Sequence, residues 1–243
     1  MEKSTQKIKE FYDGEFHSYS LNKVEEMKED LRCGLLGKLI SKDSTSILVV
    51  GCGSKKDMSI SNKKLVGLDL SITALKESKR LFPKNSYVNG DGCNLPFKNN
   101  SFDTIVCSEV IEHVLNPKKM ILEFKRVLKN NGQLIITTPN WLSFYGLFKK
   151  AGEIILGRQI LSGNQPIDNW STPKNLRNTL KPYFKIKKMY GIWYYPPTGK
   201  RPYTLPPGLI YPLFRLFHPI NNLLGVIQPN FGHVIVFDTV LEK

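Results

Sequence analysis

The chain has 243 residues, of which 41% are hydrophobic, and its 35 basic and 21 acidic residues give a formal net charge of +14. This length favours one elaborated domain, and no uninterrupted apolar run approaches the roughly 18 to 20 residues that span a bilayer. The charged N-terminus MEKSTQKIKE lacks the apolar stretch of a secretory signal, so we expect a cytoplasmic protein. Four cysteines without C-x-x-C spacing favour reduced, packed thiols over disulfides.

The positive charge is concentrated toward the C-terminus. Residues 1–140 hold 22 basic and 17 acidic residues, whereas residues 141–243 hold 13 and 4. Such a surface suits nucleic acid, anionic lipid or an anionic substrate, and it also serves solubility alone. The charge by itself does not choose among these roles.

Strands and helices alternate in the first part of the chain. A helix is predicted over 21–39, where apolar residues at 21, 24, 27, 31, 35 and 39 form one buried stripe. Short apolar runs predict strands at 46–50, 65–70, 86–88, 103–107 and 133–138. Ser71 caps a helix that ends near Pro83, and Asn116 and Pro117 begin another whose apolar face includes Leu128. This alternation predicts a doubly wound α/β sheet.

The order changes after residue 139. An amphipathic helix is predicted over 142–156, and a further helix and strand over 173–190. The run at 194–212 is too rich in proline for regular structure in its interior, and HVIVFDTVLEK at the end indicates a terminal strand.

Glycines and acidic residues follow the first three predicted strands. Gly51 and Gly53 allow a tight turn that a ligand can approach closely. Asp69 stands 18 residues beyond Gly51, where a carboxylate can accept both hydroxyls of an adenosine ribose. Asp91 follows the third strand, where it can accept from the adenine amino group. Three neighbouring strand ends would thus contact one nucleoside.

These blocks resemble the class I S-adenosylmethionine (SAM)-dependent methyltransferases, and within them the small-molecule subgroup that includes quinone-biosynthesis O-methyltransferases. The similarity lies in VVGCGS (49–54), VGLDLS (66–71), GDGCNLPFKNNSFDTIVCSEVIEHV (90–114) and LKNNGQLIITTPN (128–140). It implies a mostly parallel, seven-stranded Rossmann-like sheet with an antiparallel last strand and helical or irregular C-terminal insertions that cap the active site. The block at 90–114 disfavours an NAD-dependent dehydrogenase.

The expected organisation is a single methyltransferase domain over 1–243. It comprises N-terminal helices and a lid (1–44), a cofactor-binding core (45–140), substrate-side insertions with a late strand (141–231) and the final strand (232–243).

The resemblance also implies which residues bind SAM. Gly51, Cys52 and Gly53 would pass under the methionine part. Asp69 would hold the ribose, and Ser108 would lie near the methionine. The adenine would be bound by Asp91, flanked by Leu70, Gly90 and Gly92. Tyr12 is a candidate lid residue, with simple packing as its alternative role.

One departure from the family lies just after the glycine turn. The family usually has a third glycine at position 55 or 56, where this chain has Lys55 and Lys56. The change should loosen the packing of helix against sheet. An ammonium there would favour the cofactor's carboxylate or disfavour its sulfonium.

Methyl transfer from a sulfonium is an in-line displacement that needs alignment and a nucleophile with a free lone pair. His113, with Glu112 beside it, is the candidate general base, because an unperturbed imidazole pKa of ~6.5 suits this task. A structural cap is the alternative role. Glu109, Glu112 and His113 also form E-x-x-E-H, a weaker candidate metal site, and we expect no metal. The histidines at 17, 218 and 233 are expected to be packing or surface residues.

The acceptor pocket is expected within 141–231, where aromatic side chains can form walls for a ring-shaped ligand: Trp141, Phe144, Trp170, Trp193, Tyr194, Tyr195 and Tyr203. The apolar run 209–227 is a candidate for peripheral membrane contact. We therefore predict a SAM-dependent O-methyltransferase of a small hydrophobic, ring-containing or lipid-linked anionic molecule. The alternatives are an RNA methyltransferase, for which nucleic acid is a less favoured partner, and a cofactor-binding protein without activity. The sequence does not indicate an oligomeric state.

Overall fold

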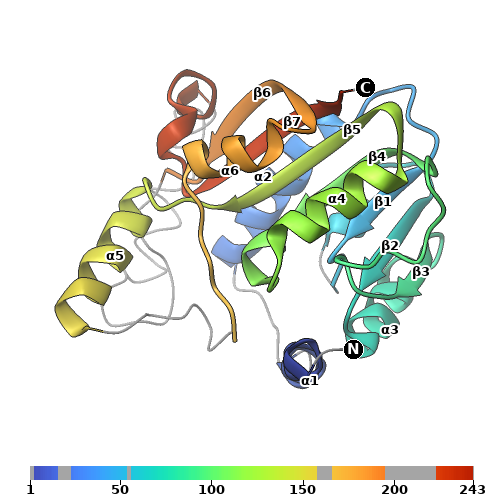
Figure 1. Ribbon diagram of the computed structural model, residues 1–243, viewed down its shortest axis with the longest axis horizontal. Helices are drawn as coiled ribbons and strands as arrows, with labels where there is room; N and C mark the ends of the chain where they lie inside the picture. The colour runs from blue at the N-terminus through green and yellow to red at the C-terminus, as the bar shows by residue number, and fades with distance from the viewer. Residues whose placement is uncertain (1–2, 16–22, 54–55, 158–165, 195–222, 243) are drawn as a thin grey trace.

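A computed structural model of the protein describes residues 3–15, 23–53, 56–157, 166–194 and 223–242. A seven-stranded sheet with the order β3-β2-β1-β4-β5-β7-β6 forms its centre (Figure 1). The strands are β1 (Ile47–Val50), β2 (Leu65–Asp69), β3 (Ser86–Asn89), β4 (Phe102–Ser108), β5 (Leu128–Pro139), β6 (Phe184–Ile192) and β7 (Val234–Leu241). Neighbours among β1 to β5 are parallel, and β7 is antiparallel to both β5 and β6. The predicted fold class is confirmed.

The helices are α1 (Lys3–Glu15), α2 (Lys23–Leu39), α3 (Ile72–Leu81), α4 (Pro117–Val127), α5 (Phe144–Leu156) and α6 (Pro173–Leu180). Three short 3-10 turns are η2 (Lys56–Ser59), η3 (Ile111–His113) and η5 (Pro229–Phe231). Both predicted caps are present, because Ser71 accepts from the N–H of Ala74 and Asn116 from that of Lys119. Within the described ranges, every helix is too short or too polar to span a bilayer.

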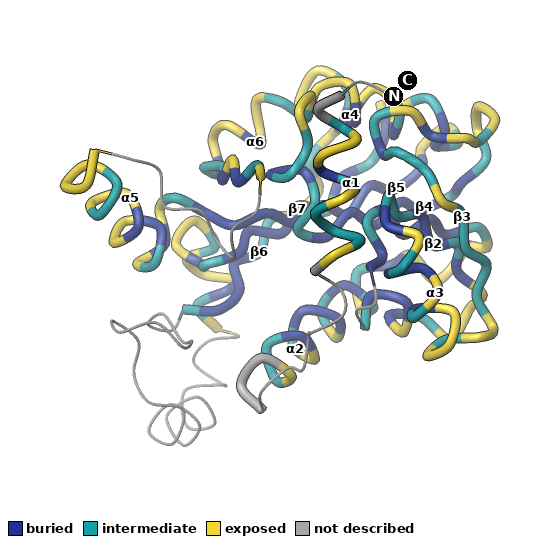
Figure 2. Tube along the Cα trace, turned by 90° about the horizontal axis from the view of Figure 1, so that it is seen from below, coloured by how far each residue is buried: buried dark blue, intermediate teal, exposed yellow. Residues whose placement is uncertain are grey.

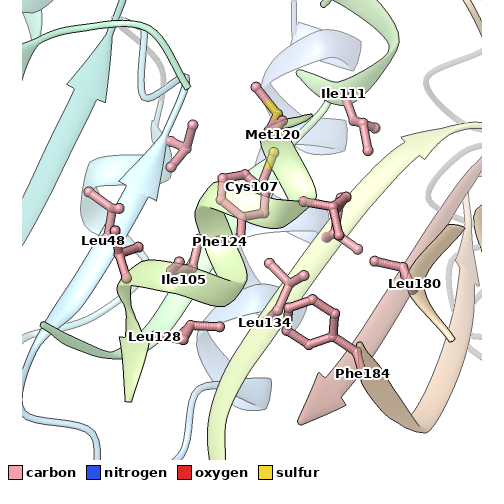
Figure 3. Packing of buried hydrophobic residues seen from close by; sticks show 14 of the residues in the cluster. Leu48, Ile105, Cys107, Ile111, Met120, Phe124, Leu128, Leu134, Leu180 and Phe184 are labelled. Carbon is pink, nitrogen blue, oxygen red and sulfur yellow. The ribbon is translucent and has the colours of Figure 1, made fainter. Parts of the chain in front are cut away.

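Two apolar cores hold helices against opposite faces of the sheet. On one face, Met120 and Phe124 of α4 and Leu180 of α6 pack with Leu134 of β5 (Figure 3). On the other face, α2 and α3 pack through residues such as Leu36. Such burial stabilises by about 25 cal/mol per Å² of apolar surface. With both faces covered, the carboxyl ends of the parallel strands form the edge where a ligand can bind.

The placement of Leu128 on the apolar face of α4 is wrong. Leu128 is the first residue of β5 and pairs with Phe102 at the start of β4. The chain passes from helix to strand without a loop, so the side chain stays in the same core although the backbone is extended.

The buried stripe predicted for α2 is also wrong. Leu31, Leu35 and Leu39 are only half-buried. The helix instead buries Glu29, Arg32, Cys33 and Leu36, followed by Ile40 just after its end. The buried face is displaced by about one residue because Arg32 forms ion pairs inside the protein, which apolar periodicity does not reveal.

Candidate active site

The turn after β1 has glycine at two positions with a left-handed backbone. Gly51 and Gly53 have φ angles of +68° and +49°, which side chains disfavour. A Cβ on Gly51 would lie 2.2 Å from Cγ2 of Val110. Cys52 between them buries its side chain, and this burial raises the pKa of its thiol. Its backbone is therefore the part that can face a ligand.

The two predicted carboxylates lie at the carboxyl ends of neighbouring strands. Asp69 ends β2, and its two oxygens accept from the N–H groups of Gly53 and Ser71, each at 2.8 Å. Asp91 follows β3, and its Oδ1 accepts from the N–H of Cys93 at 2.8 Å. A carboxylate oxygen accepts more than one hydrogen bond, so these contacts leave capacity for a ligand. The structure thus brings the glycine turn and both acids to one edge of the sheet.

Two flanking residues predicted for the adenine site lie at the same edge. The carbonyl of Leu70 accepts from Nδ2 of Asn89 at 2.9 Å. Gly92 is buried, and a Cβ there would lie 2.6 Å from Cε of Met120.

Helix α1 lies across this edge (Figure 2). Oδ1 of Asp13 accepts from Oγ of Ser71 at 2.6 Å, at the start of α3. The ring of Tyr12 is 6.4 Å from that of His113, which follows β4. Strand β1, which ends in the glycine turn, lies between β2 and β4. The contact of Asp13 is therefore on the β2 side of the turn, and the contact of Tyr12 is on the β4 side. The helix therefore has the position expected of a lid.

Two buried oxygen atoms between α1 and η3 have no hydrogen-bond partner within the described part of the chain: the hydroxyl of Tyr12 and Oε1 of Glu112. Burial raises the pKa of Tyr12, and the carboxylates of Glu112, Asp69 and Asp168 raise it further. Burial, followed by the charge of Glu109, raises the pKa of Glu112 well above its ordinary value. Orphaned polar atoms are costly in a folded protein and are typical of a site that a ligand completes.

The orientation of His113 is fixed by one hydrogen bond. Its Nδ1 lies 2.8 Å from the carbonyl oxygen of Ile167, which can only accept. Nδ1 therefore carries the hydrogen, and in the neutral ring the lone pair is on Nε2. Nε2 lies 3.7 Å from Oε1 of Glu112, whose Oε2 accepts from Oγ1 of Thr138 at 3.2 Å.

Arg32 of α2 is a central residue that the sequence did not reveal. Its fully buried guanidinium contacts the carboxylates of Glu29 at 2.5 Å, Asp57 at 3.1 Å and Glu109 at 3.6 Å. Burial opposes its charge, but Asp57, Glu109 and Glu29 raise the pKa of Arg32 well above its usual value. The i,i+3 spacing of Glu29 and Arg32 was the available signal, although such pairs usually lie on the surface.

The Arg32 cluster also determines where two predicted site residues point. The hydroxyl of Ser108 contacts Arg32 and lies 3.2 Å from Oγ1 of Thr137. Glu109 has a φ of 53°, rare for a side-chain-bearing residue, and its carboxylate turns toward Arg32. The side chains of Glu109 and Glu112 therefore have different neighbours, and within the described part of the chain no three potential metal ligands gather at one point.

Lys56 does not extend into the glycine turn. Its Nζ pairs with Oδ1 of Asp30 in α2 at 2.6 Å. This bond, followed by desolvation in the opposite sense, raises the pKa of Lys56. Lys55 lies outside the described residues.

A cavity of about 490 Å³ lies beside α5 and is lined by Trp141, Lys150, Glu153, Ile154, Gly157, Asp168, Asn169 and Trp170. The lining residues 168–170 adjoin η3, because Asn169 donates from its N–H to the carbonyl of Glu112 at 2.9 Å. The ring of Trp170 donates from Nε1 to Asp168 at 2.6 Å, and Asp168 pairs with Lys149 at 2.5 Å.

Other aromatic residues expected in the pocket lie elsewhere. Trp193 packs in the core on the α2 face, and Phe144 is exposed on α5. Tyr194 donates to the carbonyl of Gln228 at 2.8 Å. Tyr195 and Tyr203 lie outside the described residues.

His233, expected to be a packing or surface residue, is a packing residue. His233 lies against the rings of Tyr145, Trp170 and Trp193. Desolvation, followed by the charges of Lys28 and Lys149, lowers its pKa to about 3. His17 and His218 lie outside the described residues. The four cysteines are free, as predicted.

Comparison with known proteins agrees with this geometry. Residues 48–136 match a family described as a methyltransferase domain. An uncharacterised protein of Methanocaldococcus jannaschii is 28% identical over 243 residues, covering 97% of this chain and 99% of that protein. A demethylmenaquinone methyltransferase of Paenarthrobacter aurescens is 37% identical over 87 residues, covering 33% of this chain and 34% of that enzyme. This chain thus matches only about a third of the length of the quinone enzyme.

A solved structure from Thermotoga maritima has the same fold. It is described as a SAM-dependent methyltransferase and possible histamine N-methyltransferase, with 15% identity, a TM-score of 0.66, and coverage of 96% of this chain and 99% of that one. The fold is that of class I methyltransferases, and residues 48–136 match a methyltransferase domain. SAM is the cofactor of this class of enzyme.

Proposed function

We propose that this protein transfers the methyl group of SAM to an oxygen of a small hydrophobic acceptor that contains a ring or is lipid-linked and anionic. The observation that carries the proposal is the gathering of three groups under α1. These are Nε2 of His113, the hydroxyl of Tyr12 and Oε1 of Glu112, and the last two have no hydrogen-bond partner among the described residues. The cavity lined by Trp141 and Trp170 adjoins these groups through Asn169, which also lines it and bonds to the carbonyl of Glu112.

The residues at the sheet edge fit SAM. Asp69 would accept from the ribose hydroxyls and Asp91 from the adenine amino group, while the backbone from Gly51 to Gly53 would pass under the methionine part. When bound, SAM supplies an electrophilic methyl on a sulfonium. Tyr12 would cover it, and the orphaned hydroxyl of Tyr12 fits a lid residue that a ligand completes.

His113 acts as the base in this account. Nδ1 is committed to Ile167, so Nε2 takes the proton of the acceptor hydroxyl as oxygen attacks the methyl in line. Burial and the charge of Glu109 raise the pKa of Glu112, and in its protonated form this carboxyl donates a hydrogen bond that orients the acceptor. Exclusion of water by α1 strengthens both interactions.

The acceptor class follows from the cavity walls. Trp141 and Trp170 offer flat apolar surfaces. Nζ of Lys150 lies 5.3 Å from the centre of the Trp141 ring and 3.6 Å from Oε2 of Glu153, so an anionic group of the acceptor would replace Glu153 as its partner. The partial similarity to a demethylmenaquinone methyltransferase supports a quinol-like ring as the first acceptor to test.

The alternative hypothesis, a cofactor-binding protein without activity, depends on Lys55 and Lys56. Pairing of Lys56 with Asp30 argues against obstruction of the turn by that side chain. The hypothesis of an RNA methyltransferase depends on the positive charge of the chain, and this charge would also attract anionic small molecules and lipids. Membrane contact by 209–227 stays a prediction, because only 223–227 of that run lies within the described residues.

The experiment supplies SAM with a tritiated methyl group and three acceptors: reduced demethylmenaquinone, a simple catechol and total tRNA. We expect label in the organic extract of a ring acceptor. His113→Gln should reduce this rate by about 100-fold or more. Calorimetry should show that this variant binds SAM as the wild type does, and exposed Lys118→Gln serves as the matched control. Label confined to tRNA, or no heat on addition of SAM, would contradict the proposal.

A further inference from the structure

Helix α5 presents its large apolar side chains to solvent. Six of them are each between 54% and 82% exposed: Phe144, Leu147, Phe148, Ile154, Ile155 and Leu156. We call these six residues the α5 face. Apart from Leu156, their spacing along the helix forms one stripe about 20 Å long. A surface helix of a globular protein normally turns such a stripe toward the core, and α5 lies at one end of the molecule (Figure 2).

The reversed orientation of α5 is held by specific contacts. The side turned inward carries Lys149, whose buried Nζ pairs with Asp168 and lies 4.1 Å from the centre of the Trp170 ring. It also carries Gly146, where a Cβ would lie 2.4 Å from the carbonyl oxygen of Asn140. Rotating the helix to bury its apolar side would break a buried ion pair and create this clash. The contacts of Lys149 and Gly146 therefore keep the α5 face exposed in this fold.

The charge of the protein selects among partners for this face. The chain has a net charge of +14, and residues 141–243, which include α5, hold 13 basic and 4 acidic residues. Two copies of so basic a chain repel each other, whereas an anionic bilayer attracts it. An exposed lysine, Lys150, lies directly beside the α5 face, with its Nζ 3.6 Å from Oε2 of Glu153. An amphipathic helix with apolar residues on one side and lysine on its flank is typical of binding in the plane of a membrane surface.

We infer that the α5 face docks on the surface of an anionic lipid bilayer. The cavity described above adjoins this face, because Ile154 belongs to both. A lipid-linked acceptor could thus enter the cavity from the bilayer. This route rests on the proposed function, whereas the docking itself does not.

The test uses the full chain and sedimentation with vesicles of phosphatidylcholine, with and without phosphatidylglycerol. The double variant Phe148→Glu/Ile155→Glu places charges on the α5 face. Its matched control is Leu81→Glu/Leu122→Glu, at apolar residues of α3 and α4 that are 45% and 46% exposed. We expect the wild type and the control to bind anionic vesicles at least about tenfold more tightly than the α5 variant, with weaker binding in high salt.

Three results would overturn the inference. The first is no binding of the wild type to either vesicle, and the second is equal binding of the α5 variant. The third is a stable dimer by light scattering that the α5 variant converts to a monomer, because this would assign the face to a second copy. Calorimetry with SAM on the same samples separates the two hypotheses: if SAM still binds while vesicle binding fails, the inference fails and the proposed function stands.

Discussion

Asp13 and Ser71 connect the N-terminal helix to the cofactor edge of the sheet. Oδ1 of Asp13 lies 2.6 Å from Oγ of Ser71 and also accepts from the N–H of Thr73 at 3.3 Å. Ser71 stands two residues after Asp69, so this contact fixes α1 above the predicted ribose site. Burial acts to raise the pKa of Asp13, but the hydrogen bonds from Ser71 and Thr73 and the charge of Lys9 together lower it below its usual value. The position of α1 therefore depends on a charged carboxylate.

Asp13→Ala should weaken SAM binding by about three- to tenfold, because loss of a charge-assisted hydrogen bond loosens α1 over the ligand. Calorimetric titration with SAM measures the effect. Glu10→Ala, on the same helix but bonded only to Gln6 among the described hydrogen bonds of its side chain, is the matched control. Equal affinities of the Asp13 variant and the wild type would show that α1 is not a lid.

Gly51→Ala should abolish measurable SAM binding and destabilise the protein by more than about 2 kcal/mol, because it combines a disfavoured φ with a clash against Val110. Gly157→Ala isolates the conformational effect, since Gly157 has a φ of +62° and open space around it. We expect that control to cost about 1 kcal/mol and to bind SAM normally. Urea denaturation and calorimetry measure both quantities, and similar losses in the two variants would refute the packing argument.

Glu112→Gln should change the pH dependence of stability. The folded-state pKa of Glu112 is raised, so the folded protein holds a proton that the unfolded chain has lost above its pKa of about 4.3. The contribution of Glu112 to the free energy of unfolding of the wild type is therefore fully present below about pH 4.3. It falls by about 1.4 kcal/mol per pH unit as the pH rises from there toward the folded-state pKa. Glutamine does not titrate, so the stability of the variant relative to the wild type should increase as the pH rises.

Urea denaturation of both proteins at pH 5, 6 and 7 measures this difference. The same variant should retain methyl transfer within about threefold, because an amide also donates a hydrogen bond. A constant difference in stability across this pH range would mean that Glu112 is ionised in the folded protein.

Arg32→Met should destabilise the protein by about 3 to 5 kcal/mol, because it leaves Asp57 and Glu29 buried without their cation. Lys38→Met, at an exposed position near the end of the same helix, should change stability by less than about 0.5 kcal/mol. Chemical denaturation measures both variants. If Arg32→Met proved as stable as the wild type, the carboxylates would have to be neutral or hydrated, and the cluster would not hold α2 to η2.

Local patterns were sufficient to predict most strands and the edge where Asp69 and Asp91 lie, whereas the seven-stranded order with an antiparallel last strand followed from the family resemblance. Short apolar runs indicated β1 to β5, Ser71 and Asn116 indicated where α3 and α4 begin, and parallel strand order placed Asp69 and Asp91 together. These features depend on residues near one another in sequence or on the rule that parallel strands end at one edge.

Contacts between distant segments were not predictable in the same way. Arg32 is buried because three carboxylates from α2, η2 and the end of β4 converge on it, and no local pattern encodes that convergence. The orientation of α5 follows from Lys149 meeting Asp168 in a later segment, which overrides the apolar period of the helix. The hydrogen bond of His113 to Ile167 likewise joins residues 54 positions apart.

The most direct test of the account is calorimetric titration of SAM into the wild type and Asp69→Asn, with thermal unfolding as a check that both are folded. The variant keeps the shape of the side chain but lacks the carboxylate that would accept from both ribose hydroxyls. We predict one site per chain in the wild type and affinity at least about tenfold weaker in the variant. No binding by the wild type, or equal affinity in a folded variant, would contradict the placement of SAM at this edge of the sheet.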